Sequence, residues 1–294
     1  MSKLPEITCL VEAKDVLGEG PIWNPPEGAL YWVDNLRPCV WRYDPITERV
    51  DNWTMPEPIG SLVFREKGGM VAAMQTGFHF LDLATGRLER IVDPEPDLPQ
   101  NRMNDGKCDR RGRYWCGSMN PGFANATASL YRLDPDLSCH RMDTNIIVSN
   151  GMAWSPDDRT MYFADTRAET VYAYDFDVDA GAIHNRRTFI STKDMPGRVD
   201  GATVDAEGFY WCALIHDWTI GRFDPHGRLD RAIRMPVRHP TMCTFGGEKL
   251  DVLYVTSTTK FLEPGEAGQQ PLAGALFAIH DVGVRGVPEP FFKG

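Results

Sequence analysis

The length, composition and charge of the chain exclude several classes of protein. Hydrophobic residues make up 42% of its 294 residues and aromatic residues 11%, which is enough for a large core and argues against disorder. The net charge of −10, from 31 Lys and Arg against 41 Asp and Glu, disfavours nucleic acids and membrane surfaces as partners, because both are negatively charged.

The N-terminal segment and the cysteines indicate where the protein works. Residues 1–20 lack the basic start and apolar stretch of a signal peptide, and no apolar run reaches the roughly 18 residues of a membrane span. The seven cysteines are scattered and form no CxxC pair, which is typical of reduced thiols. We therefore expect a cytoplasmic protein.

Six short runs along the chain share one pattern, a turn followed by alternating aromatic and aliphatic residues. The runs begin about 40 to 50 residues apart, which is the spacing of propeller blades. In chain order they are GALYWVDN (28–35), GGMVAAMQ (68–75), GRYWCGSM (112–119), RTMYFADT (159–166), GFYWCALI (208–215) and LDVLYVTS (250–257). Alternation with a period of two indicates strands rather than helices.

The repeat predicts the fold. A unit of a few strands cannot bury both faces of its sheet alone, whereas six units stacked in a ring bury them against one another. We predict an all-β protein, a six-bladed β-propeller with four-stranded blades that forms a single domain over residues 1–294. The last blade is expected to take a strand from the other end of the chain. A two-sheet β-sandwich with accidental internal similarity is the alternative.

Polar residues interrupt apolar stretches near the start of four predicted blades. They are Glu19 in LGEGP (17–21), Asn104 in RMNDG (102–106), Asn150 in SNGMAW (149–154) and Asp200 in RVDGATVD (198–205). The last three segments each carry Asn-Gly or Asp-Gly before a strand. One such pair is usually a turn, but its recurrence at one blade position would aim the side chains at one point. Arg102 lies two residues before Asn104, on the same side of an extended chain.

The chain resembles the SMP-30/gluconolactonase/regucalcin family over nearly its whole length. The segments that carry the resemblance are LGEGPIW, RMNDGKCDRRGRYWCGSM, SNGMAWSPDDRTMYFADT and VDGATVDAEGFYWCAL, in the family's order and approximate spacing. The resemblance implies a six-bladed propeller and a divalent-metal-dependent lactonase acting on sugar lactones. It also implies that Glu19, Asn150 and Asp200 bind the metal, and that Arg102 and Asn104 bind the substrate.

The chemistry of these residues suits the implied reaction. Two carboxylates and one amide are hard oxygen donors for one divalent ion, which could be Ca²⁺, Mg²⁺, Mn²⁺, Zn²⁺ or Fe²⁺. Their two negative charges balance the ion and leave it able to polarise a lactone carbonyl. Asp200 is the candidate general base for the attacking water. Arg102 could donate paired hydrogen bonds to the sugar, with a surface salt bridge as the alternative.

One segment departs from the animal members of the family, which carry acidic, substrate-contacting residues after the strand that corresponds to CGSM. Here CGSM runs into Asn120-Pro121-Gly122, so the sugar cannot be copied from the family, and Asn120 becomes a candidate substrate-binding residue. His216 and Trp218 follow a predicted strand of the fifth blade and could line the same mouth, where Trp218 would offer an apolar face to a sugar ring. A purely structural role for these loop residues is an equal alternative.

We therefore expect a lactonase that hydrolyses a sugar aldono-lactone to its aldonic acid, as a monomer or small homo-oligomer without nucleic-acid or membrane partners. Two alternatives stay open. One is a metal-dependent esterase or phosphoesterase using the same site. The other is a non-catalytic propeller that binds calcium or a protein partner.

Overall fold

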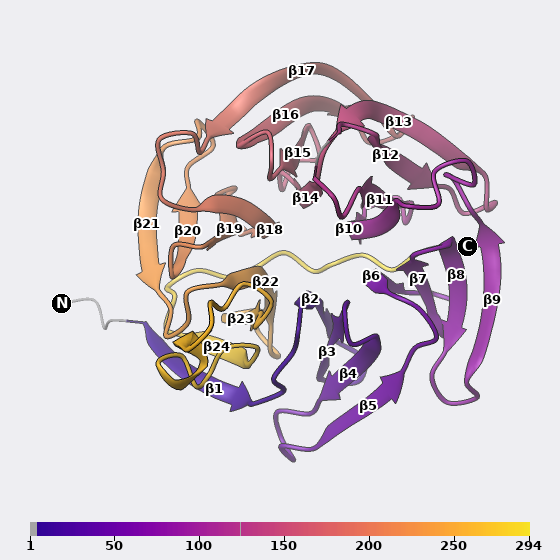
Figure 1. Cartoon of the computed structure of the whole chain (residues 1–294). Helices are drawn as coiled ribbons and strands as arrows, with labels where there is room; N and C mark the ends of the chain where they lie inside the picture. The colour runs from indigo at the N-terminus through magenta and orange to yellow at the C-terminus, as the bar shows by residue number, and fades with distance from the viewer. Residues whose placement is uncertain (1–4, 124) are drawn as a thin grey trace.

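The structure is a computed structural model and describes residues 5–123 and 125–294. Its strands form six four-stranded antiparallel sheets, arranged as blades around a ring (Figure 1). This confirms the predicted six-bladed β-propeller. The described residues contain one helical element, the 3-10 turn η1 (Glu266–Gly268), and no helix among them is long and apolar enough to cross a membrane.

Five blades run outward from the centre of the ring in chain order. The first holds β2 (Gly18–Asn24), β3 (Ala29–Asp34), β4 (Cys39–Tyr43) and β5 (Val50–Thr54). The second holds β6 (Ile59–Phe64), β7 (Met70–Met74), β8 (Gly77–Asp82) and β9 (Arg87–Val92). The third holds β10 (Arg102–Cys108), β11 (Tyr114–Met119), β12 (Ala128–Leu133) and β13 (Cys139–Ile146). The fourth holds β14 (Ser149–Trp154), β15 (Thr160–Asp165), β16 (Thr170–Asp177) and β17 (Ala182–Ser191). The fifth holds β18 (Arg198–Val204), β19 (Tyr210–Ile215), β20 (Thr219–Phe223) and β21 (Leu229–Arg234).

The sixth blade joins the two ends of the chain. Its inner strands are β22 (Pro240–Gly246), β23 (Val252–Ser257) and β24 (Leu276–His280), and its outermost strand is the N-terminal β1 (Glu6–Val11). β1 pairs antiparallel with β24, in a register that sets Ile7 opposite Ile279. This confirms that the last blade takes a strand from the other end of the chain, and the pairing closes the ring with backbone hydrogen bonds.

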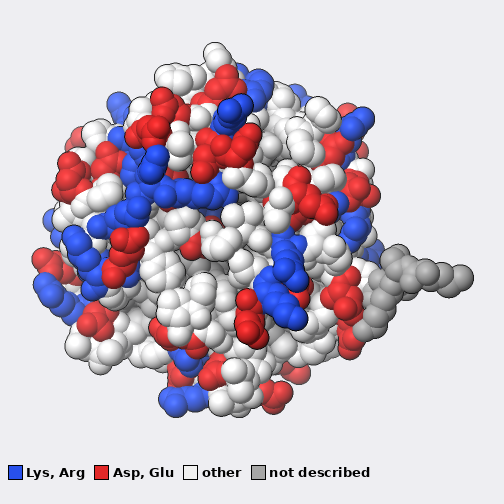
Figure 2. All heavy atoms as spheres, turned by 180° about the vertical axis from the view of Figure 1, so that it is seen from behind, with Lys and Arg blue, Asp and Glu red and all other residues white. Residues whose placement is uncertain are grey.

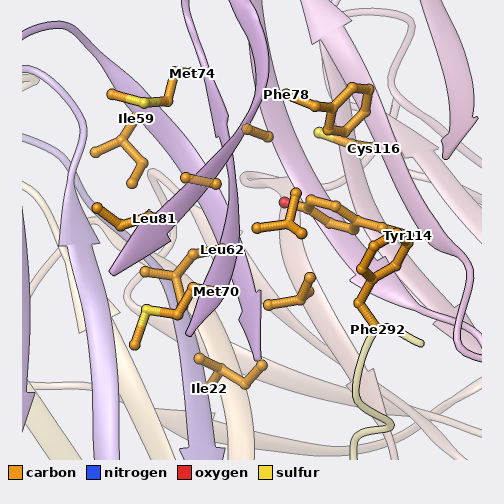
Figure 3. Close-up of a cluster of buried hydrophobic side chains, with 14 of the residues drawn as sticks. Ile22, Ile59, Leu62, Met70, Met74, Phe78, Leu81, Tyr114, Cys116 and Phe292 are labelled. Carbon is orange, nitrogen blue, oxygen red and sulfur yellow. The ribbon is translucent and has the colours of Figure 1, made fainter. Parts of the chain in front are cut away.

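The apolar runs found in the sequence form the cores between neighbouring blades. The inner strands are buried on both faces, as in β7, whereas outer strands such as β5 alternate between exposed and half-buried residues. Figure 3 shows one such core, where Phe78 of β8 meets Tyr114 of β11 edge to face, with ring centroids 5.4 Å apart. Aromatic residues therefore connect one blade to the next.

The C-terminal segment covers one end of the central channel. After β24 it crosses the ring (Figure 1), bridging Asp205 to Gly286 and Arg65 to Phe292, whose side chain is fully buried. All of these contacts lie at the ends of the innermost strands. The starts of these strands therefore face the opposite side of the ring, and Figure 2 shows the molecule from that side.

Candidate active site

The four polar residues singled out in the sequence lie at equivalent places, near the start of an innermost strand. Each of these strands carries a register irregularity there, between Glu19 and Ile22 in β2, Met103 and Gly106 in β10, Asn150 and Ala153 in β14, and Val199 and Ala202 in β18. A β-bulge bends a strand and redirects a side chain. The bulges therefore let polar side chains point along the channel while the rest of each strand stays in its sheet.

Glycine permits the bulge in β14. Gly151 has a φ of 57°, and a Cβ at this position would clash with the hydroxyl of Tyr210. The same hydroxyl donates a hydrogen bond of 2.7 Å to the carbonyl oxygen of Gly151. The Asn-Gly pair of this blade is thus a bulge rather than an ordinary turn.

Hydrogen bonds join the polar residues into one chain across three blades. Arg102 Nη1 donates to Asn104 Oδ1 at 2.7 Å, and Asn104 Nδ2 donates to Asn150 Oδ1 at 2.9 Å. Asn150 Nδ2 then donates to the hydroxyl of Thr166 at 2.8 Å, which donates in turn to the carbonyl oxygen of Val199 beside Asp200. This network fixes the orientation of both amides. The side-chain oxygen of Asn150 keeps a second lone pair for a further ligand.

The two carboxylates of the site are buried without a cation bound directly to them. Glu19 and Asp200 are 7% and 6% exposed, and no ion pair joins either to a described residue. Burial and the charge of Asp200 raise the pKa of Glu19 well above its ordinary value. Burial, followed by the charge of Asp105, raises the pKa of Asp200 to about 8, although Lys260 and Arg102 oppose this. A further cation beside the two carboxylates would favour their ionised forms.

A divalent ion fits this donor set. Glu19, Asp200 and the side-chain oxygen of Asn150 line one cavity, and all three are hard oxygen donors. The described residues contain no group of three or more His, Cys, Asp or Glu side chains that could hold a metal, so the candidate site needs the amide of Asn150 as its third ligand. One ion would replace the mutual repulsion of the carboxylates by attraction.

Asp105 is a further acidic residue of the channel that the sequence reasoning did not single out. It is 4% exposed, its Oδ2 accepts a hydrogen bond from the backbone N–H of Met152 at 3.2 Å, and its Oδ1 has no partner in the described residues. Burial raises its pKa, and its charge raises the pKa values of both Glu19 and Asp200. Asp105 thus adds negative potential next to the candidate metal site.

The cavity around these residues encloses about 570 Å³, including space open to solvent. Five side chains predicted for metal or substrate binding line it together with His216. They are Glu19, Arg102, Asn104, Asn150 and Asp200. Arg102 is buried, which lowers the pKa of its guanidinium to about 10, although the charges of Glu19 and Asp200 favour its charged form. The structure therefore brings six of the eight predicted site residues to one pocket.

His216 reaches the pocket in contact with a second histidine. Its Nδ1 lies 3.1 Å from Nδ1 of His239, so one of these atoms carries a proton and the other accepts it. Burial and neighbouring arginines lower the pKa of His216, and burial and His216 lower that of His239 to about 4. Both rings are therefore neutral at pH 7. His216 can exchange hydrogen bonds with a substrate without adding charge.

The other two predicted residues, Asn120 and Trp218, do not line this cavity. Asn120 Nδ2 donates to Asn101 Oδ1 at 3.2 Å, and Asn120 Oδ1 accepts from the N–H of Gly122 at 2.8 Å, so its side chain holds a turn. The indole of Trp218 lies beside Arg234, whose Cζ is 5.2 Å from a ring centroid.

The pocket also contains residues that the sequence reasoning missed. They are Leu17, Met119, Phe123, Val148, Thr166, Arg167, Arg198, Ile215, Lys260 and Phe261. The repeat offered a signal for two of them. Arg167 and Lys260 each follow the second strand of a blade, as the predicted His216 does, and this strand ends on the same side of the ring where the first strand begins.

The protein is a six-bladed propeller with a pocket of oxygen donors and basic side chains at one end of its channel. The chain belongs to the SMP-30/gluconolactonase/LRE-like family, because the sequence model of this family matches residues 17–259. The resemblance found in the sequence is thereby confirmed.

Relatives match over almost their full lengths. Regucalcin of Xenopus laevis is 34% identical over 295 aligned positions, covering 98% of this chain and 99% of the relative. A 6-deoxy-6-sulfogluconolactonase of Pseudomonas putida is 36% identical over 291 positions, with the same coverage. Among solved structures, a calcium-binding protein, regucalcin, of Agrobacterium tumefaciens superposes with a TM-score of 0.93 at 27% identity, covering 97% of both chains.

Proposed function

We propose that this protein is a divalent-metal-dependent hydrolase that opens a sugar lactone to its aldonic acid. The observation that carries the proposal is the pair of buried carboxylates, Glu19 and Asp200, beside the oriented amide of Asn150. The P. putida relative supports the choice of substrate, since its name describes it as a lactonase. The opposite end of the channel is covered by the C-terminal segment, so substrate would enter from the side of these residues.

The metal would be held by Glu19, Asn150 and Asp200 and would supply Lewis acidity for the lactone carbonyl. Asp200 would accept a proton from the attacking water as the new C–O bond forms. Asp200 can return that proton to the ring oxygen as the ring C–O bond breaks. The resulting carboxylic acid then loses a proton to solvent. Arg102, held by Asn104, would donate hydrogen bonds to the sugar.

A proton-release assay tests this proposal. Aldono-lactones of five- and six-carbon sugars should give acid release that is abolished by EDTA and restored by one of Ca²⁺, Mg²⁺, Mn²⁺, Zn²⁺ or Fe²⁺. The same panel should include simple esters and phosphoesters, which test the alternative of a general metal-dependent esterase. Absence of metal-dependent acid release from every lactone would contradict the proposal.

A calcium-binding propeller without catalytic activity is the second candidate, because the A. tumefaciens relative is described as a calcium-binding protein. This candidate predicts calcium binding to the same carboxylates without turnover. Calorimetric titration of Ca²⁺ beside the proton-release assay separates the two functions.

A further inference from the structure

The pocket is basic although the protein is acidic. The cavity that holds Glu19 and Asp200 is also lined by four basic residues, Arg102, Arg167, Arg198 and Lys260, which gives 4 − 2 = +2 for the lining. The whole chain carries −10. Figure 2 shows Lys and Arg side chains on this side of the molecule among the acidic residues. A divalent ion on the two carboxylates would neutralise them and leave the lining with an excess of positive charge.

Two of these cations have neither an ion pair nor a side-chain hydrogen bond to a described residue. No ion pair or side-chain hydrogen bond joins Arg167 or Lys260 to any residue in the described parts of the chain. Arg198 differs, because it forms an ion pair with Glu169 at 2.8 Å. Recognition of a neutral sugar hydroxyl needs a donor or acceptor but no net charge. Two unpaired cations at one pocket therefore suit an anion better than a hydroxyl.

Both cations lie close to one aromatic ring of the pocket. Arg167 Cζ is 4.9 Å and Lys260 Nζ 5.7 Å from the ring centroid of Phe123, and Lys260 Nζ is 5.3 Å from that of Phe261. The aromatic rings limit the positions open to both side chains. The backbone of Lys260 is also fixed, because its N–H donates to the carbonyl oxygen of Val16 at 3.1 Å.

Lys260 is also within electrostatic reach of the candidate metal site. Its ammonium lowers the pKa of Asp200. Burial and the charge of Arg102 lower the pKa of Lys260, although the charges of Asp200 and Glu19 oppose this. A substrate whose carbonyl lies at the carboxylates could therefore place its far end between Lys260 and Arg167. Both ends of one small molecule would then be recognised.

We infer that Lys260 and Arg167 form a subsite for an anionic substituent, so that the substrate is an acidic sugar lactone carrying a phosphate, sulfonate or carboxylate away from its lactone carbonyl. This inference rests on the proposed lactonase function. It adds that the enzyme discriminates between charged and neutral lactones. It assigns that discrimination to two residues outside the metal site.

Matched lactones provide the test. Turnover of gluconolactone is compared with that of 6-phosphogluconolactone and glucarolactone, which carry a phosphate and a carboxylate, in the metal-loaded enzyme. The wild type should have a kcat/KM at least about tenfold higher for one of the charged lactones, since a charge-assisted hydrogen bond contributes about that much or more. Comparing the two charged lactones identifies the preferred anion.

Variants then locate the effect. Arg167→Met should lose about tenfold or more in kcat/KM on the preferred charged lactone and change little on gluconolactone. Lys260→Met should lose more on the charged lactone than on gluconolactone, where the loss of its charge beside Asp200 also acts. Lys260→Arg should keep most of the preference, because it keeps the charge. Lys249→Met is the matched control, since Lys249 lies in the same blade between β22 and β23, at the opposite end of the ring, and it should change neither reaction.

The outcomes separate this inference from the proposed function. Hydrolysis of gluconolactone without a preference for either charged lactone, or equal losses on charged and neutral lactones in Lys260→Met, would overturn the subsite and leave the lactonase standing. If no lactone is hydrolysed, the proposed function fails. The anion subsite is then tested by separate calorimetric titrations of the protein with sorbitol 6-phosphate and with sorbitol. Binding of the phosphate that weakens in Lys260→Met would support it, and equal affinities for the two polyols would overturn it.

Discussion

Asn104 donates a hydrogen bond from its side-chain amide to the side-chain oxygen of Asn150, 2.9 Å away and across the boundary between the third and fourth blades. The same nitrogen also donates to the carbonyl oxygen of Ser149 at 2.8 Å, while the oxygen of Asn104 accepts from Arg102. Asn104 thereby orients a proposed metal ligand and a proposed substrate-binding residue at once. An alanine or aspartate could not make all three hydrogen bonds.

Asn104→Ala should therefore reduce metal affinity and turnover by about 10- to 100-fold, the usual effect of losing a residue that orients a metal ligand. Affinity is measured by calorimetric titration of the metal, and turnover by proton release. Asn24→Ala is the matched control, because Asn24 is also buried and hydrogen-bonded but lies at the other end of β2. The control should lose about 1 kcal/mol of stability at an unchanged metal affinity. Equal metal affinity in both variants would contradict this role of Asn104.

The raised pKa values of the two carboxylates predict how pH affects the metal-free protein. The pKa of Asp200 rises from 3.8 to about 8 on folding, and that of Glu19 also rises. Between these limits the folded state binds more protons than the unfolded state, so stability falls as pH increases from about 4 to about 8. Thermal unfolding in EDTA should show this decline, and Asp200→Asn should flatten it. An EDTA profile that Asp200→Asn leaves unchanged would contradict the assignment.

Metal binding should have the opposite pH dependence. The ion competes with protons for Glu19 and Asp200, so its affinity should rise by about tenfold per pH unit for each proton displaced, up to about pH 8. The increase in melting temperature caused by the metal should therefore be larger at pH 8 than at pH 6. Calorimetry in buffers of different ionisation enthalpy measures the number of protons released. Release of no proton at pH 6 would mean that the ion does not bind at these carboxylates.

The fold could be predicted from the sequence because the repeat records it directly. Each alternating run, such as 112–119, became the second strand of a blade, since its period of two matches a strand buried between two sheets. The polar residues Asn150 and Asp200 were recognisable because they recur at one blade position in an apolar context. The bulges bring these recurring side chains close together in space. In the sequence, only the glycines that follow the polar residues indicate the bulges.

Loop residues were harder to predict because the alternation of strands does not extend into turns. His216 and Trp218 both have positive φ values, 75° and 59°, so the chain reverses between them and only His216 reaches the pocket. Arg167 and Lys260 could not be recognised in the same way, because each lies in a polar turn rather than in an apolar stretch. Their placement depends on the ring geometry, which brings loops of different blades together.

The cysteines should take no part in catalysis. All seven are free thiols, and only Cys9 and Cys139 are not fully buried. Burial raises the pKa of both, that of Cys139 to about 12, so neither is a reactive thiolate at neutral pH. Brief treatment with iodoacetamide at pH 7.5 should modify at most these two thiols, as counted by intact mass, and leave most of the activity. Rapid loss of activity that substrate prevents would place a reactive thiol in the site instead.

Asp200 and Glu19 should respond differently to loss of their charge, because Asp200 is proposed to bind the metal and to accept a proton from water, whereas Glu19 only binds the metal. Asp200→Asn keeps the shape and one oxygen donor, and removal of a buried carboxylate with a raised pKa should not prevent folding. Loss of a general base typically reduces the rate by about 10²- to 10⁴-fold. Glu19→Gln should mainly weaken metal binding, so excess metal should restore much of its turnover. Turnover is measured against metal concentration for both variants. If excess metal restores Asp200→Asn to nearly wild-type turnover, Asp200 is a ligand alone and another group accepts the proton.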